Sequence, residues 1–237
     1  MRYHVVIPAA GSGRRFATTL PKQYAVLGSS TVIELAMAPF EADADCAGIT
    51  IAIATDDAHW PVIALRRGAN ITTVAGGEQR AYSVLNALRS LATHVRDDGW
   101  VFVHDAARPC FSSSDLAALK RELADDPVGG LLAVPLADTL KRAQATAPTV
   151  ASTVDRAGLW RAATPQVFRF GVLFRALESA LASGKLPTDE AQAVEWAGHT
   201  PRLVAGRADN LKVTTPDDLQ LASAILSMRP SHSTKDK

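Results

Sequence analysis

The chain reads Val5-Val6-Ile7-Pro8-Ala9-Ala10-Gly11-Ser12-Gly13-Arg14-Arg15-Phe16 close to its N-terminus. The apolar, β-branched start of this segment predicts a buried strand, and the small residues after it predict a tight turn. Backbone N–H groups in such a turn form a concavity that binds anions. Two arginines beside the turn, and Lys22 in the following Pro21-Lys22-Gln23-Tyr24, suit a polyphosphate. The segment therefore predicts a nucleotide site at the edge of an α/β sheet.

Two common nucleotide-binding motifs are excluded. The dinucleotide fingerprint Gly-x-Gly-x-x-Gly needs a third glycine where Phe16 stands. A P-loop ends in Gly-Lys-Ser or Gly-Lys-Thr, whereas the Gly184-Lys185 pair of this chain is followed by leucine. A plain strand-to-helix turn with two surface arginines is the alternative, but the additional cation in the Pro-Lys-Gln-Tyr segment favours a functional loop.

The composition is that of an ordinary globular protein. Hydrophobic residues make up 47% of the 237 residues and charged residues 21%, and the formal net charge is +1. Such a balance gives no overall field that favours a nucleic acid or a membrane as partner. Only two cysteines, Cys46 and Cys110, argue against a disulfide scaffold and fit a reducing compartment. Without an apolar run long enough for a membrane span or a signal peptide, we expect a soluble cytoplasmic protein.

Short apolar runs alternate with amphipathic stretches over the first 135 residues. This alternation predicts an α/β fold, a Rossmann-like, doubly wound, mostly parallel sheet with a ligand crevice at the carboxyl ends of its strands. The predicted strands are 3–7, 48–54, 71–74, 100–104 and 131–134. The predicted helices begin at a Thr31–Glu34 capping box, near Ala81, after Ser112-Ser113-Ser114, near Val172 and after the cap Thr215, with Pro216 as the first helical residue.

The pattern breaks after Pro135, because residues 136–157 are polar and carry no helical stripe. Two short strands joined by residues 145–148 would make a hairpin that leaves the main body. Regular structure then resumes, so we expect residues 1–229 to form a single domain with a β-arm insertion at about 136–157. The polar residues 230–237 predict a disordered tail.

Two further segments offer side chains for nucleotide chemistry. In His104-Asp105-Ala106-Ala107-Arg108-Pro109 a carboxylate follows a predicted strand, where it is placed to hold Mg²⁺. A helix cap or a salt bridge to Arg108 explains that carboxylate equally well. In Gly76-Gly77-Glu78-Gln79-Arg80-Ala81-Tyr82-Ser83 the glycines allow flat approach to a base, and Arg80 and Ser83 share one helix face. The alternative there is a tight turn with a solvated Arg80.

Near the C-terminus, Arg207-Ala208-Asp209-Asn210-Leu211-Lys212-Val213-Thr214 interleaves charged and apolar residues. Asp209 is a candidate second metal ligand and Lys212 a candidate phosphate contact, against the alternative of an edge strand with solvated charges. Helix capping alone explains Thr188-Asp189-Glu190. The sequence contains no Cys/His cluster that would predict a zinc site and no Gly-x-Ser-x-Gly motif that would predict a hydrolase.

Taken together and in order, these segments resemble one family, the 2-C-methyl-D-erythritol 4-phosphate cytidylyltransferases of the non-mevalonate isoprenoid pathway. The similarity runs from about Val5 to Leu221, and its specificity comes from the order and spacing of motifs that are weak one by one. The matching segments are 8–15, 21–24, 76–84, 103–109 and 206–214, with Thr153-Val154-Asp155-Arg156 and Thr164-Pro165-Gln166 in addition.

The resemblance implies a nucleotidyltransferase domain that transfers CMP from CTP to 2-C-methyl-D-erythritol 4-phosphate. The products would be 4-diphosphocytidyl-2-C-methyl-D-erythritol and pyrophosphate. The resemblance also implies Mg²⁺ as cofactor and a homodimer whose projecting β-arms interlock.

By position, the resemblance also assigns roles to individual residues. Arg15 and Lys22 would stabilise the triphosphate charge, with Lys212 near the α-phosphate. Cytidine would be held by Ala9, Ala10, Gly11, Gly77, Arg80 and Ser83. Asp105 and Asp209 would lie beside the metal and the substrate hydroxyls. Thr139 and Arg156 would bind the substrate phosphate across the dimer, with Thr164 and Thr188 nearby.

Two rival functions stay open at this point. Pentitol-phosphate cytidylyltransferases, notably those using ribitol 5-phosphate, tend to carry Ala-Gly-Gly and Asp-Ser-Val-Arg-Pro in these segments. This chain has Ala9-Ala10-Gly11 and Asp105-Ala106-Ala107-Arg108-Pro109, which favours methylerythritol phosphate. The second rival is a non-catalytic nucleotide-binding regulator, and the intact set of cations and acids argues against it.

Overall fold

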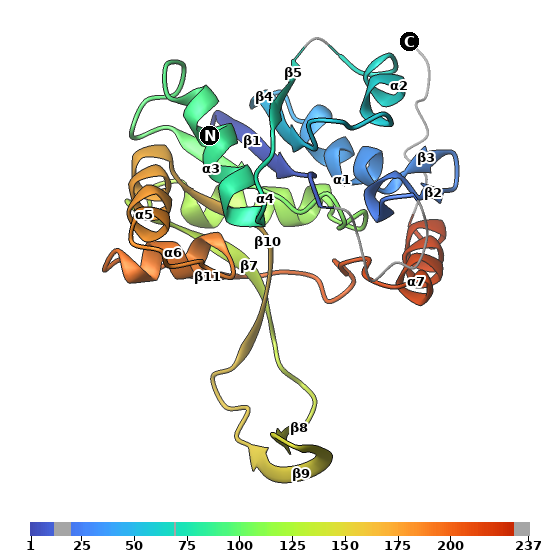
Figure 1. Ribbon diagram of the computed structural model, residues 1–237, viewed down its shortest axis with the longest axis vertical. Helices are drawn as coiled ribbons and strands as arrows, with labels where there is room; N and C mark the ends of the chain where they lie inside the picture. Colours follow the sequence, from blue (N-terminus) through green and yellow to red (C-terminus); the bar gives the residue numbers. More distant parts are fainter. Residues whose placement is uncertain (12–19, 69, 230–237) are drawn as a thin grey trace.

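A sheet of seven strands carries the fold in the computed structural model, which describes residues 1–11, 20–68 and 70–229 (Figure 1). The strand order is β11-β7-β10-β6-β1-β4-β5. All neighbours pair in parallel except β10, which is antiparallel to both β6 and β7. The strands are β1 (Tyr3–Pro8), β4 (Cys46–Ile53), β5 (Ile71–Ala75), β6 (Trp100–Val103), β7 (Gly129–Pro135), β10 (Trp160–Arg169) and β11 (Arg202–Ala205).

The five strands expected from the sequence are confirmed, and β10 and β11 are additional. A continuous apolar run is missing from both. The first three residues of β10 are exposed, and its buried part contains Thr164, Pro165 and Gln166. In β11 only Val204 is buried, because this strand forms the edge of the sheet. Both strands therefore lack the apolar signature of a central parallel strand.

Helices cover both faces of the sheet, which confirms the doubly wound arrangement. Val5 and Ile7 of β1 face α1 (Val32–Glu41) and α4 (Ser113–Leu123) in one hydrophobic cluster. Val6, which points the other way, packs in a second cluster with α3 (Arg80–Leu91), α5 (Phe170–Ala182) and α6 (Glu190–Trp196). Successive side chains of a strand point to opposite faces, so a strand that is apolar at every position needs cover on both.

The helix starts follow the capping residues in the sequence. Thr31 caps α1 in a capping box with Glu34, and Ser112 caps α4 by accepting the Asp115 N–H. Thr215 caps α7, where Pro216 is the first residue. The remaining elements are η2 (Lys22–Tyr24), β2 (Val26–Leu27), β3 (Ser30–Thr31), α2 (Trp60–Ala64), α3 (Arg80–Leu91), α5 (Phe170–Ala182), α6 (Glu190–Trp196) and α7 (Pro216–Ser227).

A two-stranded hairpin of β8 (Leu140–Gln144) and β9 (Ala147–Val154) lies within the segment 136–157, as predicted. Figure 1 shows β7 and β10 leading out of the sheet into this hairpin, which lies apart from the main body. We call residues 136–157 the arm; its part in dimerisation stays a prediction.

No helix among the described residues has the length and apolar character needed to cross a membrane. The cytoplasmic location stays a prediction. The expected single domain over 1–229 and the expected tail stay predictions too, and residues 230–237 lie outside the described residues.

Candidate active site

A cavity of about 420 Å³ opens at the carboxyl ends of β1 and β6 and at the start of α3. This is the edge of the sheet where a crevice was expected. Its lining comes from five separate parts of the chain: Pro8, Ala10, Gly11, Lys22, Gln23, Gly77, Glu78, Gln79, Arg80, Ser83, Asp105, Ala106, Ala107, Lys212 and Thr214.

The loop after β1 reaches the cavity through Ala10 and Gly11, and Gln23 holds it in place. The Gln23 amide donates to the carbonyl oxygens of Ala9 at 2.8 Å and Gly11 at 3.2 Å. Ala9 itself donates its N–H to the Ala52 carbonyl of β4. Gln23 is buried and belongs to the Pro-Lys-Gln-Tyr segment, but its role as a clamp on the loop depends on tertiary structure. Arg15 lies outside the described residues, so its predicted role stays a prediction.

The glycine pair between β5 and α3 allows the backbone to approach the loop closely. A Cβ added at Gly76 would overlap with the Ala10 Cβ, and one at Gly77 would overlap with the Tyr82 Cβ. The Ser83 hydroxyl accepts the Gly77 N–H at 3.0 Å and so fixes the turn from the first turns of α3. Ala10 and Tyr82 therefore occupy the space where side chains at Gly76 and Gly77 would lie. Gly77 and Ser83 also line the cavity.

The Asp105 carboxylate, directly after β6, is surrounded by three cations. Arg80 Nε lies 3.0 Å from Oδ1, Lys212 Nζ lies 2.9 Å from Oδ2, and Arg108 Nε lies 3.4 Å from Oδ2. Burial alone would raise the pKa of this carboxyl, but the charges of Arg80, Lys212 and Arg108 outweigh it and hold the pKa well below its usual range. The expected salt bridge between Asp105 and Arg108 is present, and it is the longest of these three ion pairs.

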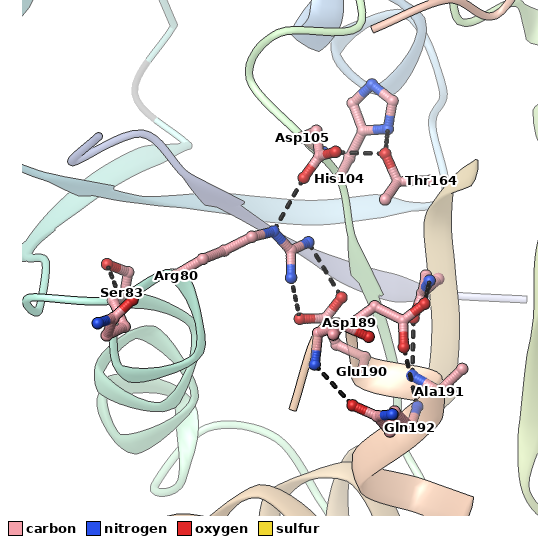
Figure 2. Close-up of polar contacts among 12 residues, drawn as sticks. Arg80, Ser83, His104, Asp105, Thr164, Asp189, Glu190, Ala191 and Gln192 are labelled. Carbon is pink, nitrogen blue, oxygen red and sulfur yellow. Dashed lines mark hydrogen bonds and ion pairs between the residues drawn. The ribbon is translucent and has the colours of Figure 1, made fainter. Parts of the chain in front are cut away.

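Arg80 is held on its other side by Glu190, the first residue of α6 (Figure 2). Its Nη1 and Nη2 donate to the two carboxylate oxygens of Glu190 at 2.6 Å and 3.0 Å. The reading of Arg80 as a solvated side chain is therefore wrong. Capping alone does not explain Glu190 either, because Asp189 caps α6 and the Glu190 side chain, 1% exposed, points to Arg80.

Thr164 lies behind Asp105, where its hydroxyl is already engaged. Thr164 Oγ1 accepts the Asp105 N–H at 3.0 Å and lies 3.0 Å from Nδ1 of the fully buried His104. Burial lowers the pKa of the His104 ring to about 3, so the ring is neutral. Its Nε2 faces the Arg108 carbonyl, which only accepts, so Nε2 carries the proton and the Thr164 hydroxyl donates to Nδ1.

Ala9 and Thr164 are buried and do not line the cavity, and four other predicted site residues lie away from it. Asp209 is absent from the cavity lining, and its carboxylate pairs with Arg207 and Arg229 at 2.6 Å and 3.3 Å. The segment 207–214 is irregular, so its reading as an edge strand is wrong; the edge strand β11 ends at Ala205. The other three are exposed: Thr139 and Arg156 in the arm, and Thr188 before α6.

The described residues contain no group of three or more His, Cys, Asp or Glu that could hold a metal ion by themselves. The acidic residues that line the cavity are Asp105 and Glu78. Together with Lys22, Arg80 and Lys212, they make a cavity whose described charges suit an anionic ligand.

The chain was compared with known proteins. A family model described as 2-C-methyl-D-erythritol 4-phosphate cytidylyltransferase matches residues 3–228. The curated protein of that name from Pseudomonas entomophila (strain L48) is 53% identical over 219 residues, which span 92% of this chain and 93% of that protein. The one from Pseudomonas putida (strain GB-1) is 52% identical over the same shares.

Solved structures agree. A crystal structure of a 4-diphosphocytidyl-2C-methyl-D-erythritol synthase superposes with a TM-score of 0.84 and 37% identity, covering 95% of this chain and all of that one. The cytidylyltransferase of Francisella tularensis gives a TM-score of 0.81 and 34% identity over the same shares. The chain therefore belongs to the 2-C-methyl-D-erythritol 4-phosphate cytidylyltransferase family.

Proposed function

We propose that this protein transfers CMP from CTP to 2-C-methyl-D-erythritol 4-phosphate, releasing pyrophosphate, in the non-mevalonate route to isoprenoid precursors. The observation that carries the proposal is the cavity at the strand ends, which is lined by Lys22, Arg80 and Lys212. The family model matches residues 3–228, which include every strand of the sheet. A phosphate oxygen of the sugar phosphate attacks the α-phosphorus of CTP, and the bond from that phosphorus to the bridging oxygen of pyrophosphate breaks.

This reaction makes modest demands on acid–base groups. A phosphate monoester is already a nucleophile at neutral pH, so no strong general base is needed. Two anions must be brought together, so catalysis rests on positioning and on cations aimed at the charge of the transition state. Lys22 and Lys212 line the cavity and are the described candidates for that charge. His104 is buried and neutral, which suits a structural part.

Mg²⁺ is part of the proposal. Mg²⁺ takes one or two carboxylates together with phosphate oxygens and waters, and Asp105 offers a carboxylate in the cavity lining. Both of its oxygens contact cations, so Asp105 would have to release at least one of Arg80, Arg108 and Lys212 to hold the ion. When bound, the ion would neutralise phosphate charge. Asp105 would hold it from the cavity lining, and the role of Asp209 stays a prediction because Asp209 lies outside that lining.

The substrate phosphate and the dimer belong to the same proposal. Thr139 and Arg156 are exposed in the arm, which lies apart from the main body in Figure 1. An arm that reaches the cavity of a second subunit would bring these side chains to the sugar phosphate. The position of the arm and the family match support this arrangement of two subunits. The arrangement requires a homodimer, which is therefore part of the proposal.

The direct test is a pyrophosphate-release assay with CTP and Mg²⁺ against a panel of sugar phosphates. We expect release with 2-C-methyl-D-erythritol 4-phosphate and little with ribitol 5-phosphate. Faster release with ribitol 5-phosphate would favour the pentitol-phosphate reaction, and no release with any acceptor would favour a nucleotide-binding regulator.

A further inference from the structure

We propose that Glu190 is a positioning residue for the nucleotide: it holds the Arg80 guanidinium in the orientation that CTP binding requires. The inference rests on the proposed function of the same cavity and adds a residue from α6 that does not line it. Glu190 acts through Arg80, and its own side chain is 1% exposed.

Arg80 is gripped at three of its donor positions. Nε donates to Asp105 at 3.0 Å, and Nη1 and Nη2 donate to Glu190 at 2.6 Å and 3.0 Å (Figure 2). A paired, fork-like contact of this kind fixes the plane of the guanidinium as well as its place. These three contacts therefore orient the Arg80 guanidinium at the cavity wall.

Glu190 is fixed independently of Arg80. Asp189 caps α6 by accepting the Gln192 N–H at 2.9 Å, and its second oxygen accepts from Gln166 Nε2 at 2.9 Å. Gln166 Oε1 in turn accepts the Ala191 N–H at 2.8 Å. Both ends of this buried amide in β10 are thus used to fasten the first turn of α6. Because Glu190 is the first residue of that turn, the sheet sets the position of its backbone, from which the buried side chain reaches Arg80.

The charges around Asp105 explain why the ion pair between Arg80 and Glu190 is needed. Arg80, Arg108 and Lys212 all contact the single carboxylate of Asp105. Without the charge of Glu190, three cations would share one anion, and Arg80 would be free to turn toward the phosphates of a bound nucleotide. Arg80 and Ser83 line the same wall of the cavity, so a turn of Arg80 would disturb the nucleoside end of the site.

The test compares steady-state kinetics of Glu190→Gln with a matched control, Glu195→Gln, an exposed acid of the same helix. We expect Glu190→Gln to raise the KM for CTP by about tenfold or more, which corresponds to the loss of one charged hydrogen-bond pair. The KM for the sugar phosphate should stay within about twofold, and the control should match the wild type. Equal rises in both KM values, or no rise, would overturn the proposal.

A double-mutant cycle separates positioning from general stability. If Glu190 acts through Arg80, then Arg80→Met combined with Glu190→Gln should have the same KM for CTP as Arg80→Met alone. Independent, additive losses would contradict the inference.

Glu190→Asp keeps the charge, so it covers the case in which Glu190→Gln does not fold. Its shorter side chain should raise the KM for CTP by a smaller factor, and an unchanged KM would contradict the inference. The wild-type assay separates failure of this inference from failure of the proposed function. An inactive wild type would argue against the proposed function, whereas an active wild type with an unchanged KM for CTP in the Glu190 variants would argue against the inference.

Discussion

At the scale of single residues, the cavity depends on close packing of its walls as well as on its charged side chains. Gly76 has no room for a Cβ beside Ala10, and Gln23 is held between two backbone carbonyls. His104 and Thr164 form a buried support behind Asp105. Substitutions at these positions should separate chemistry from packing, because the two kinds of change have different signatures in turnover, in KM and in stability.

Lys22→Ala tests the chemistry. If Lys22 stabilises charge in the transition state, kcat should fall by about 10²–10³-fold while the protein stays folded. We expect the same of Arg15→Ala. Circular dichroism and thermal unfolding check the fold, and Lys185→Ala, far along the chain beside Trp196, is the control. A folded variant with near-normal turnover would remove that residue from the charge-stabilising set.

Gly76→Ala tests the packing of the loop after β1. The new Cβ would overlap with the Ala10 Cβ, so the turn or the loop must shift, at a cost of about 1–3 kcal/mol in the free energy of unfolding. The KM for CTP should rise with it. Gly68→Ala is the matched control, because a Cβ there meets no atom within 4 Å. Similar stabilities and KM values for the two variants, measured by urea unfolding and kinetics, would contradict the prediction.

His104→Gln tests the buried neutral ring. Its pKa is about 3 in the folded protein and about 6.5 in the unfolded chain, so between these values the unfolded state binds the extra proton. The free energy of unfolding therefore falls as the pH drops below about 6.5, by up to about 1.4 kcal/mol per pH unit. The glutamine variant should lose this part of the slope between about pH 4.5 and 6 and keep the wild-type slope above about pH 7. Parallel urea-unfolding curves for the two proteins would show that the ring does not titrate in this way.

At the scale of elements, strand ends and helix starts determine which side chains meet. The carboxyl end of β6 places Asp105, the start of α3 places Arg80, and the start of α6 places Glu190. Because β10 runs antiparallel between β6 and β7, it brings Thr164 beside Asp105 and Gln166 beside the first turn of α6. The arm, by contrast, makes its hydrogen-bonded ladder within itself and presents an exposed surface.

Arg156→Ala tests the arm as a substrate-binding element. We expect a KM for 2-C-methyl-D-erythritol 4-phosphate raised by about tenfold or more, since a charged contact to a phosphate is lost, and an unchanged KM for CTP. Arg142→Ala, also exposed in the arm, is the control. If the KM for the sugar phosphate is the same in Arg156→Ala and the wild type, the arm residue does not contact this substrate.

At the scale of the whole molecule, the question is whether one subunit completes the site of another. Subunits carrying Lys22→Ala can be mixed with subunits carrying Arg156→Ala, at a sugar-phosphate concentration below the wild-type KM. If Arg156 acts across a two-fold dimer, half of the dimers are mixed and each mixed dimer has one intact site. The mixture should then recover about a quarter of the wild-type activity after subunit exchange.

Sedimentation of the wild type should give twice the mass of the chain, and a variant with residues 140–154 replaced by a short Gly-Ser linker should give a monomer. Activity in the mixture no higher than in the two separate variants would argue against a site shared between subunits. A monomeric, active wild type would overturn the dimer itself.

The sequence by itself determined the α/β class, five of the seven strands, the helix starts other than that of α2, and most of the cavity. These features are local: period, capping residues and turn glycines act within a few positions of the chain. The order of motifs also identified the family. Glu190 was missed because its partner Arg80 is 110 positions away. The site role of Asp209 stays a prediction, and its pairing with two arginines outside the cavity lining could not be read from the sequence. Only the tertiary structure decided these contacts, because the strand order and the antiparallel β10 set which distant side chains share a buried, low-dielectric space.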